Sequence, residues 1–418
     1  MTDPIMSPGE QRPEPVLAGE RNQTLDVLRG MAILGILVLN IQSFAMPSFA
    51  YIVPTAWGDF TGANFAVWLA SHLLADQKFV TIFSLLFGAG IVLMAERQQA
   101  KGLSAAGLHY RRMAWLALFG LLHAYLIWYG DILLTLALCG AAAYLVWRLP
   151  PAALVGIGLV AIAIPATCWG ALGMTLSHWP DEAIAGLEHD WGPAAIEEAR
   201  WEYQVYNAGW LAQMPHRAMM ALYLQTFVLV FHSFWAISGL MCLGMALYKA
   251  GWLTGQASAW TYHLALGLAV LVGLPVIGLG VMHNMQRGWD ATWPFVGMQF
   301  NYWGSLLVAG GWIAAAVLLV RHQWLSRVRQ ALSAVGQTAL SNYLFQSLLC
   351  TFIFYGHGLG AFGDITRLGQ LGLVLVVWSI QIALSLWWVR RYRFGPMEWL
   401  WRSMTYRRRQ PMRRVANL

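Results

Sequence analysis

The stretch TLDVLRGMAILGILVLN, residues 24–40, joins a long apolar run to polar groups at both ends. Asp26 and Arg29 stand three residues apart, a spacing at which opposite charges pair on a helix. Asn40 follows Arg29 by close to three helical turns, so the two side chains share a face, about 16 Å apart along the axis. We expect a membrane-spanning helix here. Its polar groups either serve a site or only set topology and bond a neighbouring helix.

The rest of the chain is equally apolar. Of its 418 residues, 58% are hydrophobic and 11% are charged, and the mean hydropathy is +0.54. These values exclude an ordinary soluble domain and fit repeated crossings of a hydrocarbon core about 30 Å thick. The predicted fold class is all-α, a polytopic transmembrane helical bundle of about ten (ten or eleven) spans. The spans lie near residues 27–46, 77–95, 112–129, 131–147, 151–173, 218–248, 259–282, 295–320, 337–355 and 368–389.

Charge asymmetry orients these spans. Most of the 26 Lys and Arg residues fall on one side when both termini are cytoplasmic. Residues 1–20 then form a disordered cytoplasmic tail, and residues 21–394 form the bundle, with an outer loop at 175–216. Residues 395–418 form a basic amphipathic tail whose apolar side chains, Met397, Leu400, Trp401 and Met404, are predicted to face the inner leaflet.

Motifs that are missing from the sequence limit which metals and partners we expect. No Cys/His cluster has metal-ligand spacing, so no metal is expected. No Gly-rich nucleotide loop of the Walker type is present. We expect membrane lipids, and no nucleic acid, as partners.

Two ionisable residues around the third span suggest chemistry. His123 precedes Asp131 by eight residues across an outer turn, and such a pair serves as acid and base in many enzymes. The alternative is structural: Asp131 caps the next helix and His123 is hydrogen-bonded within the bundle. Lys78, at the outer start of the second span, is predicted to extend toward the interface.

Three further features concern helix packing. Thr338, Asn342 and Gln346 recur every four residues, and this polar stripe either lines a cavity or joins helices. Gly88 and Gly90 are predicted to permit close helix contact. Residues 63–76 form either an interfacial or re-entrant helix or an extension of the second span.

Several blocks of sequence carry a family resemblance. The blocks are LDVLRGMAILGILVLNI, TIFSLLFGAGI, GLLHAYLIWYGDILL, GQTALSNYLFQSLLCTFIFY and RFGPMEWLWRSMTY. In number and order, from about residue 20 to 406, they resemble the signature blocks of the YeiB-type family of bacterial inner-membrane proteins. The resemblance implies a multi-pass protein of the bacterial inner membrane.

The first block also resembles the first membrane helix of the acyltransferase-3 and heparan-α-glucosaminide N-acetyltransferase families. This resemblance implies acyl-CoA as a cytoplasmic acyl donor and an unidentified acceptor on the other side. Arg29 with Asp26 matches the end where those families bring the CoA phosphates. Arg111 and Arg112 are assigned to the same face by charge alone.

The histidines of those two families are absent from this chain. One family ends its first helix in a histidine, where this sequence has Asn40, which cannot serve as a general base. The other places a histidine three residues before Trp-Asn-Gly, and Pro54 stands three residues before Trp57 here. His123 with Asp131 is therefore the first choice for the base, with Asn40 retained as a polar group of the site.

Three functions are compatible with these features. The first is a membrane acyltransferase that uses acyl-CoA. The second is a transporter for a small metabolite, supported by the polar stripe and weakened by the lack of visible repeats. The third is a non-catalytic lipid-binding or scaffold protein that retains the fold, suggested by the missing histidines.

Overall fold

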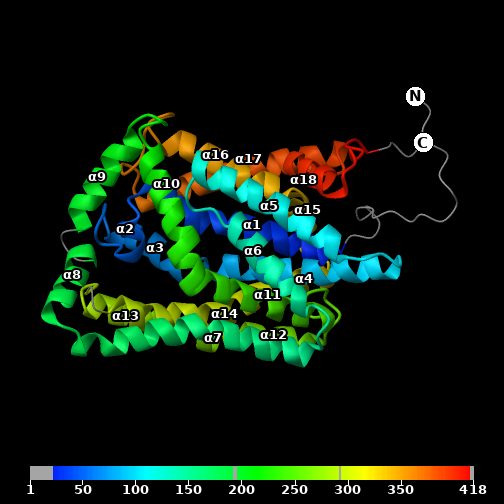
Figure 1. Ribbon diagram of the computed structural model, residues 1–418, viewed down its shortest axis with the longest axis horizontal. Helices are drawn as coiled ribbons and strands as arrows, with labels where there is room; N and C mark the ends of the chain where they lie inside the picture. Colours follow the sequence, from blue (N-terminus) through cyan, green and yellow to red (C-terminus); the bar gives the residue numbers. More distant parts are fainter. Residues whose placement is uncertain (1–21, 192–194, 291–292, 415–418) are drawn as a thin grey trace.

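The computed structural model describes residues 22–191, 195–290 and 293–414. Within these ranges the chain is a bundle of helices, most of which run along the long axis of the molecule (Figure 1). The described residues contain no strand, apart from an isolated bridge between Tyr392 and Arg413. The predicted disordered tail, residues 1–20, lies outside the described ranges.

The helices differ widely in length. They are α1 (Gln23–Ala45), α2 (Phe49–Ile52), α3 (Gly62–Leu74), α4 (Lys78–Ala100), α5 (Ala106–Leu126), α6 (Leu133–Ala143), α7 (Pro151–Thr175), α8 (Asp181–Trp191), α9 (Ala195–Asn207), α10 (Met214–Tyr223), α11 (Phe234–Lys249), α12 (Ala259–Leu268), α13 (Leu274–Gln286), α14 (Pro294–Arg321), α15 (Ser326–Gln337), α16 (Ala339–Phe354), α17 (Arg367–Arg391) and α18 (Pro396–Tyr406). π-Helical turns join α10 to α11 and α12 to α13 without a break.

Every predicted span coincides with a helix or with helices in line. In the described part of the chain, 7 helical segments are long and apolar enough to cross a membrane, judged by length and composition. The remaining predicted spans coincide with α5, α6 and α16, of which α6 and α16 are shorter apolar helices. The all-α polytopic fold class is therefore confirmed.

The bundle has two ends that differ in content (Figure 1). We call the end that holds the start of α1, together with α15 and α18, the terminal end. We call the end that holds α2, α8 and α9 the loop end, and the described residues of the predicted outer loop at 175–216 lie there. Placement of the terminal end in the cytoplasm stays a prediction.

Helix α1 runs through the middle of the bundle and contacts α4, α14, α15, α16 and α17. Its crossing with α15 is very close. A Cβ atom on Gly30 would lie 1.9 Å from the carbonyl oxygen of Leu332, and one on Gly336 would lie 1.9 Å from that of Asp26. Only glycine fits at these two positions, because any side chain would push the two backbones apart.

A second glycine contact joins α4 to α11. A Cβ atom on Gly88 would lie 2.0 Å from the carbonyl oxygen of Met241, so the predicted close packing is confirmed there. The same prediction is wrong for Gly90, where a Cβ atom would meet nothing within 4 Å. Gly90 lies two residues on, so it faces away from α11 and toward a cavity.

This difference gives a matched pair of variants. We expect Gly88→Ala to lower the unfolding free energy by about 1–3 kcal/mol, because the methyl group overfills the α4–α11 contact. Gly90→Ala has open space and a better helix former, so its stability should stay the same or rise by up to about 1 kcal/mol. Thermal unfolding of the purified proteins in detergent measures both effects. Equal melting temperatures for the two variants would contradict the assigned packing.

Candidate functional site

A cavity of about 600 Å³ lies at the terminal end of the bundle. Helices α1, α4, α5, α6, α16 and α18 contribute to its wall. On α1 the lining residues Asp26, Arg29, Ile33 and Ile36 recur every three or four positions, and Leu25 lies beside the first of them. The cavity therefore follows one face of the helix quoted at the outset.

Basic side chains gather in the part of this cavity that is nearest the terminal end of the bundle. The lining residues that carry positive charge are Arg29, Arg97, Lys101, Arg112 and Arg402. Asp26 pairs with Arg29 at 2.8 Å, as the sequence predicts. The Arg29 side chain is still 31% exposed, so its remaining donors can reach a ligand.

The part of the cavity that lies deeper in the bundle is apolar. Its lining includes Ile33, Phe83, Phe87, Met113 and Leu133, which come from four different helices. A cationic entrance that leads to an apolar interior suits a molecule with an anionic head and a hydrophobic chain.

Helix α18 forms one wall of the cavity. Trp401 Nε1 donates to the carbonyl of Arg112 at 2.9 Å, and the Arg112 guanidinium lies 5.0 Å from the Trp401 ring centroid. Arg111 donates to the carbonyl of Thr405 at 2.9 Å, so it anchors α18 and is not part of the cavity lining. The apolar side chains predicted to face the inner leaflet pack against the bundle instead; they are Met397, Leu400, Trp401 and Met404.

Glu398 fastens α18 to the start of α16. Its carboxylate accepts from the backbone N–H groups of Leu340 at 2.6 Å and Ser341 at 3.2 Å, and from the Ser341 hydroxyl at 2.5 Å. These contacts cap the N-terminus of α16. Burial raises the pKa of Glu398 above its ordinary value, although the hydrogen bonds act in the opposite direction.

The predicted contact between His123 and Asp131 is present. Nδ1 of His123 lies 2.8 Å from Asp131 Oδ2, and both side chains are 1% exposed. Asp131 Oδ1 also accepts from the backbone N–H of Leu134, so the capping alternative holds as well. The ring of Tyr343, which lines the cavity, lies 5.1 Å from that of His123. Tyr343 thus lies between the pair and the cavity. A catalytic role for His123 and Asp131 stays a prediction.

Four other predicted residues lie outside the cavity lining. Asn40 shares a helix face with Arg29, but the cavity ends at Ile36, one turn earlier. The polar stripe is buried between α16 and α17: Asn342 and Thr338 bond Ser385 at 3.0 and 3.3 Å, and Gln346 donates to Gln381 at 2.9 Å. These bonds favour the helix-joining alternative for Thr338, Asn342 and Gln346.

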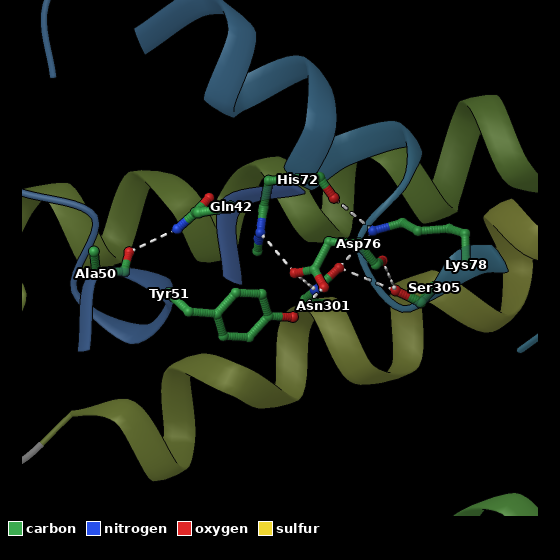
Figure 2. Close-up of polar contacts among 8 residues, drawn as sticks. All are labelled: Gln42, Ala50, Tyr51, His72, Asp76, Lys78, Asn301 and Ser305. Carbon is green, nitrogen blue, oxygen red and sulfur yellow. Dashed lines mark hydrogen bonds and ion pairs between the residues drawn. The ribbon is translucent and has the colours of Figure 1, made fainter. Parts of the chain in front are cut away.

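A second pocket, of about 220 Å³, lies at the loop end between α1, α2, α3, α13 and α14. Figure 2 shows the polar contacts beside it. The predicted extension of Lys78 to the interface is wrong: the side chain is 0% exposed, and Nζ donates to the His72 carbonyl and to Asn301 Oδ1, each at 2.6 Å. The chain turns sharply at Gln77, where φ is 63°, and this turn directs Lys78 into the bundle.

Asp76 is the centre of this network (Figure 2). It accepts from the Tyr51 hydroxyl at 2.7 Å and from Asn301 Nδ2 at 2.8 Å, and His72 Nδ1 lies 3.1 Å from it. The available signal was a histidine one helical turn before an acid, next to a lysine. Sequence reasoning missed the site because Tyr51 and Asn301 come from distant parts of the chain.

Another buried histidine–acid contact also lies at the loop end. Glu202 of α9 accepts from the backbone N–H of Ser48 at 2.7 Å and lies 3.2 Å from His216 Nε2. This contact joins α9 to α2 and α10. Among the described residues, no three His, Cys, Asp or Glu side chains converge as metal ligands would.

The raised pKa of Glu398 leads to a pH prediction. Because the folded state holds this proton more tightly than the unfolded chain, protonation stabilises the fold below the unfolded pKa. That contribution is lost as pH rises from the ordinary value of 4.5 through the raised folded value. The melting temperature of the wild type relative to Glu398→Gln should therefore fall as pH rises. A difference that stays constant between about pH 4 and pH 8 would contradict this account.

Comparison with known proteins places the chain among uncharacterised relatives. A family described as a protein of unknown function, DUF418, matches residues 247–408. YeiB of Escherichia coli (strain K12) is 33% identical over 410 residues, which cover 94% of this chain and 98% of that protein. YxaH of Bacillus subtilis (strain 168) is 31% identical over 420 residues, which cover 96% and 98%. No solved structure matches the chain significantly.

Proposed function

This chain belongs to the YeiB family of multi-pass helical proteins, and we propose that it is a membrane acyltransferase with an acyl-CoA donor. The donor occupies the cavity at the terminal end, and the acceptor reaches the protein from the loop end. One observation carries the proposal: a single cavity joins a cluster of basic side chains to an apolar interior.

The chemistry of the donor matches both parts of the cavity. An acyl-CoA carries several phosphate charges, and guanidinium groups such as those of Arg29 and Arg112 bind phosphate with charge-assisted hydrogen bonds. Its acyl chain gains about 0.8 kcal/mol for each CH₂ group removed from water. The volume of about 600 Å³ lies within the usual range for small-molecule sites.

The proposed reaction needs a nucleophile to attack the thioester carbonyl carbon. The carbon–sulfur bond then breaks, and CoA leaves with its thiol through the basic entrance. In this scheme the arginines bind and orient the donor, while the apolar walls exclude water from the thioester.

A non-catalytic lipid-binding protein is the second candidate. An anionic phospholipid has the same combination of charged head and apolar chain, so the same cavity supports it. The transporter hypothesis has less support, because the polar stripe that suggested it forms hydrogen bonds between α16 and α17.

Binding of palmitoyl-CoA to the purified protein in nanodiscs tests the proposal. We expect saturable binding that weakens by about 10- to 100-fold in Arg29→Ala, because a charge-assisted hydrogen bond contributes about 1.5–3 kcal/mol. Arg112→Ala should weaken binding to a similar extent.

Arg327→Ala is the matched control. Arg327 is exposed on α15 at the same end of the bundle, and it does not line the cavity, so its loss should leave the affinity unchanged. The proposal fails if the wild type shows no saturable binding, or if all three variants bind alike. Tight binding of phosphatidylglycerol with no competition from palmitoyl-CoA would select the lipid-binding candidate.

A further inference from the structure

The second pocket holds a histidine with the geometry of a general base. Nδ1 of His72 lies 3.1 Å from Asp76 Oδ2, which leaves Nε2 as the ring nitrogen for a molecule in the pocket. The His72 side chain is 20% exposed, whereas that of His123 is 1% exposed. A base must come within hydrogen-bonding reach of the proton that it removes, and His72 lines the pocket that such a molecule would enter.

Asp76 is built to hold that imidazole in place. Its carboxylate also accepts from Tyr51 and Asn301, and Lys78 lies on the far side of Asn301 (Figure 2). Tyr51 and Asn301 hold the carboxylate in a fixed position beside His72. A fixed carboxylate selects the tautomer in which Nδ1 carries the hydrogen and Nε2 has a free lone pair.

The walls of the pocket indicate what kind of molecule enters. Trp68, Trp289 and Trp293 contribute aromatic surface, and the Trp68 ring is stacked on His72 with centroids 5.1 Å apart. Gln42 and Asn284 add amide groups that both donate and accept hydrogen bonds. Aromatic faces combined with amides suit a neutral molecule that carries hydroxyl groups.

The two sites approach each other along α1. Ile36 lines the first cavity and Leu39 lines the second pocket, a separation of about 4.5 Å along the helix axis. At this level the Phe79 ring of α4 packs directly on Gly35. The contact between Phe79 and Gly35 therefore lies beside the boundary between the two sites.

We propose that the second pocket is the acceptor site and that His72 is the base that removes the proton from an acceptor hydroxyl. This inference rests on the proposed function, because the first cavity supplies the thioester. The hydroxyl proton moves to His72 Nε2, the oxygen bonds to the thioester carbonyl carbon, and the carbon–sulfur bond breaks. The departing thiolate receives a proton from the imidazolium, so the products are an ester and CoA thiol.

The test compares two histidines that each contact an aspartate. Purified wild type, His72→Gln and His123→Gln in nanodiscs receive palmitoyl-CoA with glycerol as the acceptor, and release of CoA thiol is followed by a thiol reagent. His72→Gln should bind palmitoyl-CoA within about twofold of the wild type but release CoA about 100-fold or more slowly. His322→Gln, assayed in the same way, is the control: His322 is exposed and lines neither cavity, so this variant should retain the wild-type rate within about threefold. His123→Gln tests the competing assignment of the base.

The outcomes separate the two levels of the proposal. If the wild type does not bind palmitoyl-CoA, the proposed function is wrong. Intact binding with equal rates in His72→Gln and His123→Gln overturns only the role of His72, and so does intact binding with no CoA release by the wild type. A result in which His123→Gln alone is slow assigns the base to His123 and also overturns this inference.

A chemical measurement tests the site without turnover. Diethyl pyrocarbonate modifies accessible neutral imidazoles, and mass spectrometry of the digested protein locates the modified residues. We expect His72 to react in the wild type while His123 stays unmodified. If His72 is as protected as His123, the pocket does not present a reactive imidazole and the inference fails.

Discussion

The close backbone contact between α1 and α15 is the constraint on which both sites depend. At Gly30 and Gly336 the two helices approach so nearly that no side chain fits between them. This contact holds α1 in the middle of the bundle, where the face with Asp26 and Arg29 lines the first cavity. In a medium as apolar as the helices themselves, such close packing supplies association that hydrophobic burial cannot.

Charged groups inside the bundle follow one rule. Each is expensive to bury in an apolar environment, so it needs a partner or an opening. Lys78 has Asn301 and a backbone carbonyl, Asp76 has three donors, and Arg29 has Asp26 and the cavity. Two of these groups, Arg29 and Asp76, line the two cavities described above.

Prediction from the sequence succeeded for features that depend on residues close together in the chain. The apolar runs coincide with helices, and the contacts Asp26–Arg29 and His123–Asp131 join residues near each other in the chain. Prediction failed for side chains whose surroundings are set by a distant segment of the chain. Whether Lys78 extends outward or inward is decided by Asn301 of α14. An amphipathic pattern such as that of α18 also does not reveal whether its apolar face meets lipid or protein.

The donor site is tested most directly by a structure of the protein in nanodiscs with a non-hydrolysable thioether analogue of palmitoyl-CoA. We expect phosphate density beside Arg29 and Arg112 and a hydrocarbon chain that passes Phe83 toward the boundary at Ile36. An empty cavity at saturating analogue, or one filled by phospholipid that the analogue does not displace, would contradict this expectation.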